Sequence, residues 1–64
     1  MEAYRISLPP ARLHPIDHRC VVFLALVTRW GEPEWCYGVA AFRRDEADRQ
    51  ARGWVAREGG RVVA

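Results

Sequence analysis

The segment CVVFLALVTRWGEPEWCYGVAAF, residues 20–42, decides the fold because a short turn separates two strand-like runs within it. The first run, residues 20–28, is apolar on both alternating sets of positions, which is typical of a central strand covered on two faces. Gly31 is suited to the positive φ of a turn, and Pro33 cannot donate to a strand ladder. Residues 35–42 resume the strand pattern, so the segment predicts a β-hairpin.

The register of this hairpin decides which side chains share a face, since alternate residues of a strand point to opposite sides. A turn symmetric about Glu32 and Pro33 predicts that Trp30 lies opposite Trp35. One face then carries Val22, Leu24, Leu26, Thr28, Trp30, Trp35, Tyr37 and Val39. The other face carries Phe23, Ala25, Val27, Cys36, Gly38, Ala40 and Phe42. Small residues dominate the second face, so we expect a helix to pack there.

A helix is predicted over residues 46–58. Asp45 is a favourable N-cap, and Gly59 with Gly60 provides a C-terminal stop. Gly53 costs the helix about 1 kcal/mol relative to alanine, and we expect it to allow close approach to a neighbouring element. A single apolar stripe consists of Ala47, Ala51, Trp54 and Val55.

The flanking segments complete the fold. Residues 4–8 alternate in polarity, as a half-exposed strand does, and residues 61–64 form a short closing strand. Residues 11–19 contain a proline and no clean period, which indicates an ordered loop. The sequence therefore predicts a single α+β domain over residues 1–64, in the order β-β-β-α-β, with a small antiparallel sheet and one helix on one face.

The composition favours a small protein that is not an enzyme. The chain has 64 residues, ten arginines, no lysine and eight acidic residues, for a net charge of +2. Arginine makes bidentate and stacking contacts that lysine does not, although GC-rich codon usage gives the same bias without function. A fold this small has little room for a substrate cleft, and no nucleophile and base are suitably placed. We expect no catalytic residue and no cofactor.

Histidine and cysteine provide the only candidates for a metal site: His14, His18, Cys20 and Cys36. Structural zinc sites take their ligands in close pairs, whereas both cysteines belong to predicted strands and point to opposite faces. The sequence favours two buried thiols and two histidines at the solvent edge over a zinc site.

Nothing in the sequence predicts a membrane or an oxidising compartment. The first residues, MEAYRISLPPARLHPIDH, lack the apolar region of a signal peptide. The longest apolar run, CVVFLALV, is far shorter than the roughly 18 residues that span a bilayer. We expect a cytoplasmic protein with reduced thiols.

The face that contains both hairpin tryptophans is the candidate binding surface. Facing indoles stabilise a hairpin by up to about 1 kcal/mol, which is a sufficient structural reason for the pair. One helix covers only one face, however, so the loop of residues 9–19, a second copy in a homodimer, or a partner protein must cover the other. Tryptophan, tyrosine and arginine dominate interface hot spots. The predicted partner-binding residues are Trp30, Trp35 and Tyr37 as anchors, with Arg29, Arg43 and Arg44 as the rim.

Nucleic-acid binding is the alternative function. Basic residues gather in the helical third of the chain, and this alternative depends on Arg49, Arg52 and Arg57. We expect Asp45 to pair with Arg49 and Asp48 with Arg52, which compensates part of the positive charge.

A small single-domain chain with a ββα core, no enzyme signature and an arginine-only, tryptophan-rich surface resembles the small inhibitors that bacteriophages and mobile elements encode, anti-CRISPR proteins among them. The resemblance covers size and architecture, so it transfers no functional residue. It implies a stoichiometric inhibitor that blocks a larger host protein complex, such as a CRISPR effector, in the host cytoplasm. The near-neutral charge departs from the acidic members of that class that mimic DNA.

Overall fold

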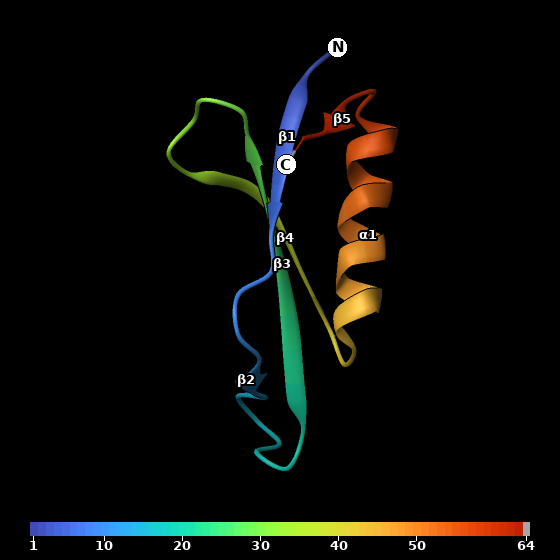
Figure 1. Ribbon diagram of the computed structural model, residues 1–64. Helices are drawn as coiled ribbons and strands as arrows, with labels where there is room; N and C mark the ends of the chain where they lie inside the picture. The colour runs from blue at the N-terminus through green and yellow to red at the C-terminus, as the bar shows by residue number, and fades with distance from the viewer. Residues whose placement is uncertain (64) are drawn as a thin grey trace.

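A computed structural model describes residues 1–63 and has a mixed α+β fold, with a sheet of five strands and one helix packed against it (Figure 1). The elements are β1 (Ala3–Ser7), β2 (Arg12–Leu13), β3 (Val21–Arg29), β4 (Trp35–Ala41), α1 (Arg44–Arg57) and β5 (Arg61–Val62). The predicted fold class is confirmed. The short strand β2 lies inside the segment predicted as a loop. Within residues 1–63 no helix has the length and apolar character needed to cross a bilayer.

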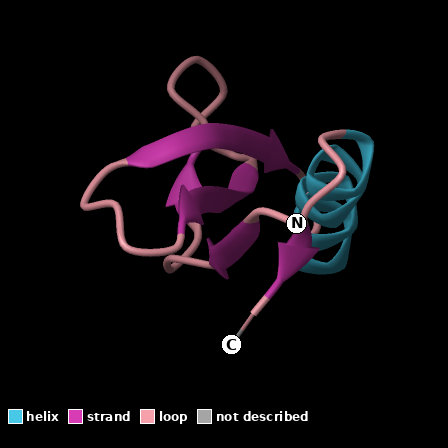
Figure 2. Cartoon of the chain, turned by 90° about the horizontal axis from the view of Figure 1, so that it is seen from above, coloured by secondary structure: helices cyan, strands magenta, loops and turns pink. Residues whose placement is uncertain are grey.

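Strand β3 is the centre of the sheet because it pairs with three other strands. Antiparallel β4 lies along one edge, and β1 and β2 share the other edge at opposite ends of β3. The closing strand β5 runs parallel to β1. Because β1 and β4 are both antiparallel to β3, β4 and β5 run in the same direction, and a parallel connection requires a crossover. Helix α1 supplies that crossover and therefore lies on one side of the strands (Figure 2).

The core lies between α1 and the sheet. The buried helical stripe is Ala47, Ala51 and Val55, which packs with Ala25, Val27 and Tyr4. The ring of Trp54 stacks on Tyr37 with centroids 4.6 Å apart and meets Tyr4 edge-on at 5.6 Å. The predicted apolar stripe is confirmed. Helix α1 contacts β1, β3, β4 and β5, whereas β2 and the first residues of β3 extend past the helix (Figure 1).

The predicted register of the hairpin is wrong by one residue. Val27 pairs with Tyr37 and Ala25 with Val39, and a bulge then brings Trp35 opposite Thr28. A one-residue shift moves a whole strand to the other face, so Tyr37 and Val39 pack against the helix in place of Cys36 and Gly38. The larger side chains bury more apolar area there, and Trp54 provides a ring on which Tyr37 stacks.

The start of the helix also differs from the prediction. Helix α1 begins at Arg44, with Arg43 as an N-cap that makes no side-chain capping bond. Asp45 lies in the first turn, where its negative charge interacts favourably with the positive end of the helix dipole. Its carboxylate also accepts a hydrogen bond from Arg43. The glycine stop is confirmed, since Gly59 has a φ of 74° directly after the last turn.

Candidate partner-binding face

The face of the sheet opposite α1, which we call the outer face, carries both apolar and basic side chains. Period-two alternation from the core residues assigns its members. They are Ala3, Arg5 and Ser7 from β1, Arg12 from β2, Val22, Leu24, Leu26 and Thr28 from β3, Trp35, Gly38 and Ala40 from β4, and Trp30 and Phe42 just beyond the strand ends. The helix is on the opposite side, so within the described chain only neighbouring side chains and loops shield this face.

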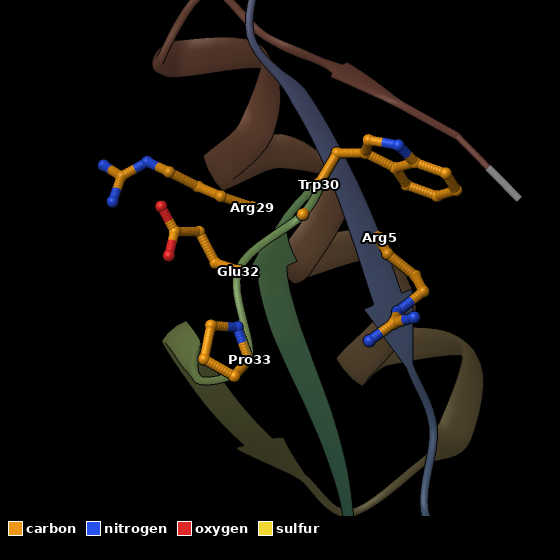
Figure 3. A pocket seen from close by; sticks show the side chains of 6 residues that line it. Arg5, Arg29, Trp30, Glu32 and Pro33 are labelled. Atoms are coloured by element: carbon orange, nitrogen blue, oxygen red, sulfur yellow. The ribbon is translucent and has the colours of Figure 1, made fainter.

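Trp30 and Trp35 are the largest exposed groups at the turn end of the outer face, with 61% and 60% of their surface accessible. The two indoles do not face each other across the hairpin. A Cβ added to Gly38 would lie 3.5 Å from the Trp35 ring, so that ring lies over Gly38. The Trp30 amide donates to the carbonyl of Ala3 at 2.9 Å, and its ring lies on the same side of the hairpin as Arg5 (Figure 3). The amino-terminal loop encloses neither ring.

The structure separates Tyr37 from the tryptophans with which it was grouped. Its ring is half-buried on the helix face, in the stack with Trp54. Its position follows from the bulge at Cys36, which inserts one extra residue between Trp35 and the rest of β4. Nothing in the hairpin sequence distinguishes this bulged register from the symmetric one.

The three predicted rim arginines do not form a rim around the tryptophans. Arg29 points away from Trp30 (Figure 3) and forms an ion pair with Glu2 at 3.5 Å. Arg43 pairs with Asp45 at 3.3 Å, and the guanidinium of Arg44 lies 5.2 Å from the centre of the Phe23 ring. Of the six predicted residues, Trp30 and Trp35 are the ones that lie on the outer face.

Two of the three helical arginines assigned to nucleic-acid binding are paired within the helix. Arg52 pairs with Asp48 at 3.0 Å, as predicted. Arg49 pairs with Glu46 rather than with Asp45, so that predicted pair is wrong. The hydrogen bond from Gln50 and the charge of Arg49 lower the pKa of Glu46.

The four candidate metal ligands are not gathered into one site. Within residues 1–63, no group of three or more His, Cys, Asp or Glu side chains is placed to hold an ion. Nδ1 of His14 accepts the amide hydrogens of Ile16 and Asp17, each at 3.1 Å. Cys36 is exposed in the bulge, whereas the sequence predicted a buried thiol. Cys20, at the opposite end of β3, donates to Asp17 at 3.4 Å.

Asp17 organises the turn that leads into β3. Its carboxylate accepts hydrogen bonds from the backbone amide and the side chain of Arg19, at 3.1 and 3.2 Å. These bonds and the one from Cys20 lower the pKa of Asp17. The ionised carboxylate therefore holds the loop against the start of the central strand.

A hollow of about 570 Å³ at the far end of the outer face was not predicted from the sequence. The residues that line it are Arg12, Leu13, His14, Pro15, Val22, Leu24, Ala40, Ala41 and Phe42. It exists because Arg12 pairs with Val22 and Leu13 with Val21, which folds the amino-terminal loop back beside β3. Two sequence features could have indicated this hollow. Leu13 is a large apolar residue beside a proline-rich segment, and Phe42 is a large apolar residue at a strand end.

Comparison of the chain with models of known families, with curated proteins and with solved structures gives no significant match. The case for a function therefore rests on the outer face and on the chemistry of the side chains that it exposes.

Proposed function

We propose that this chain is a non-enzymatic binding protein that docks a partner protein on the outer face, with Trp30 and Trp35 as apolar anchors. The observation that carries the proposal is the exposure of both indoles on the side of the sheet that lacks a helix. Buried tryptophans supply much of the binding energy at protein interfaces. Their exposure here leaves that apolar area available to a partner.

The specific form of the proposal is a stoichiometric inhibitor that occupies the surface of a larger host protein complex. Its support is the resemblance in size and architecture to small phage-encoded inhibitors, anti-CRISPR proteins among them. Such a protein needs an exposed surface that is stable without the partner, and a rigid sheet provides one because little ordering entropy is lost on binding.

The test replaces both anchors. We expect the double variant Trp30→Ala/Trp35→Ala no longer to capture the proteins that the wild-type chain binds in a host lysate, because each substitution removes exposed ring area from the docking face. Ile16→Ala is the matched control, since Ile16 is a highly exposed apolar residue outside the outer face. Circular dichroism checks that each variant is folded. Undiminished capture by the double variant contradicts the anchor assignment.

The nucleic-acid alternative makes a different prediction. Binding through Arg49, Arg52 and Arg57 would weaken steeply between about 50 mM and about 200 mM salt, since phosphate contacts release counterions. A gel shift with single- and double-stranded DNA at both salt concentrations measures this dependence. A strong shift that is lost in Arg49→Gln/Arg52→Gln/Arg57→Gln would replace the protein-binding proposal.

A further inference from the structure

The hollow at the far end of the outer face combines apolar walls with polar side chains that act as hydrogen-bond donors. Arg12, His14, Leu24, Ala40 and Phe42 are among the residues that line it. Arg12 is positively charged and makes no ion pair within residues 1–63. Nδ1 of His14 already accepts two backbone amides, so the proton of the neutral ring is on Nε2, which is a donor. No acidic residue lines the hollow. The hollow is therefore suited to a negatively charged group that accepts hydrogen bonds from Arg12 and His14.

The other two large hollows lack this one-sided character. The hollow beside the hairpin, shown in Figure 3, includes Glu32 together with Arg5 and Arg29. The hollow at the start of α1 includes Asp45 and Asp48, which are already paired with arginines. Each of these two places contains at least one carboxylate, whereas none lines the hollow at Arg12.

Few acidic residues of the chain are free to supply the missing charge to a second copy docked face to face. Five of the eight are engaged in ion pairs: Glu2, Asp17, Asp45, Glu46 and Asp48. The other three, Glu32, Glu34 and Glu58, lie in the hairpin turn and at the end of α1, outside the hollow. A second outer face would bring its own Arg5 and Arg12, and like charges across an interface disfavour association. A foreign partner with carboxylates therefore fits this charge pattern better than a second copy does.

The walls distinguish a protein partner from a nucleic acid. Bases bind to sheets by stacking on exposed aromatic rings, whereas Val22, Leu24 and Ala40 supply an aliphatic floor. The one aromatic wall, Phe42, is already stacked against His14, with centroids 6.3 Å apart. Aliphatic floors suit the bulky apolar side chains of peptides.

We infer that this hollow is a docking site for a peptide segment of a partner protein in which a bulky apolar side chain is flanked by an aspartate or glutamate. The apolar side chain enters between Leu24, Ala40 and Phe42, and the carboxylate accepts hydrogen bonds from Arg12 and His14. The inference rests on the proposed binding role of the outer face and specifies the chemistry of its partner.

The first experiment selects a phage-displayed library of random peptides, about 12 residues long, on the immobilised whole chain; peptides of this kind dock through alternating side-chain pockets. We expect the enriched sequences to place Asp or Glu beside Leu, Ile, Phe or Trp. A synthetic peptide from that set should shift the amide signals of Val22, Leu24 and Ala40 in nuclear magnetic resonance spectra. Enrichment of neutral or basic sequences, or no enrichment, overturns the inference.

Two pairs of variants then test the site with the selected peptide. Arg12→Gln should weaken binding about tenfold, as expected for the loss of a charge-assisted hydrogen bond, while Arg57→Gln should leave binding unchanged. Ala40→Leu fills the floor and should abolish binding, whereas Ala56→Leu, at an exposed helical position, should not. Wild-type affinity in Arg12→Gln or Ala40→Leu overturns the inference.

The outcomes separate this inference from the proposed function. If the enriched peptides lack acidic residues and their binding is lost in Trp30→Ala/Trp35→Ala, the acidic docking site is refuted and the outer face remains a binding surface. A fluorescent oligothymidine that binds at about 50 mM salt and displaces the selected peptide would contradict both.

Discussion

Gly60 lies against the ring of Tyr4, where no side chain fits. A Cβ on Gly60 would clash with that ring, lying 2.7 Å from its Cδ2, and would come within 2.9 Å of the carbonyl oxygen of Glu2. Tyr4 is buried and meets Trp54 edge-on, so it cannot move aside without disturbing the core. We expect Gly60→Ala to lower the free energy of unfolding by about 1–3 kcal/mol, measured by urea denaturation. Unchanged stability would show that β5 is not held tightly against β1.

Gly53 behaves differently although it is buried to a similar extent. A Cβ there would meet a terminal nitrogen of Arg57 at 3.5 Å, which is an ordinary contact. The prediction that Gly53 allows close helix packing is therefore wrong. We expect Gly53→Ala to raise the free energy of unfolding by up to about 1 kcal/mol, the difference in helix propensity. A decrease in the free energy of unfolding in the same urea titration would contradict this prediction, since it would mean that the added methyl group clashes with a neighbouring atom.

The hairpin shows at the level of the element what the sequence could predict and what it could not. The two strands and their turn follow from local patterns around Gly31 and Pro33. The register does not, because the symmetric and bulged alternatives both place Gly31 and Pro33 in the connection and differ in which side chains of β4 meet α1. Packing of Tyr37 against Trp54 is a tertiary contact, and a pattern confined to one hairpin contains no information about it.

The bulged register is testable by comparing two aromatic residues of β4. We expect Tyr37→Ala to destabilise the fold by about 3 kcal/mol, as losses of packed aromatic rings do. Trp35→Ala should cost less than about 1 kcal/mol, because its ring lies largely in solvent. Thermal denaturation followed by circular dichroism measures both. Equal losses in the two variants would favour the symmetric register, in which both residues share one face.

For the molecule as a whole, acidic pH should weaken the fold through two carboxylates. Hydrogen bonds from Arg19 and Cys20 hold the pKa of Asp17 below its ordinary value of 3.8, and Gln50 and Arg49 hold that of Glu46 below 4.5. A depressed folded-state pKa means that the unfolded chain binds more protons. The stabilisation is therefore complete above the unfolded pKa values and is lost as the pH falls through the folded ones.

Urea titrations at neutral pH and at about pH 3, below the ordinary carboxyl values, measure this loss. Asp17→Asn/Glu46→Gln removes both titrating groups and should show a smaller decrease between the two conditions. An equal decrease in the double variant would assign the acid sensitivity to other residues.

The candidate site could be predicted only in part. The uncovered face and the exposure of Trp30 and Trp35 follow from the presence of a single helix, which the sequence indicates clearly. The hollow at Arg12 requires a strand of two residues to pair with β3, and so short a strand has no periodicity to detect. The prediction for Arg29 failed because its partner Glu2 is distant in sequence and only the folded chain brings the two close. Arg43 pairs with its sequence neighbour Asp45, which was expected to pair with Arg49.

Strand β1 lies between β3 and β5, and Ala3 pairs with Arg61. The earliest and latest parts of the described chain therefore meet along one seam. During synthesis this pairing cannot form until the segment after α1 has been made, so one edge of β1 stays unpaired until then. Deletion of residues 3–4 or of residues 61–62 would expose the same edge, because each pair is the hydrogen-bonding partner of the other.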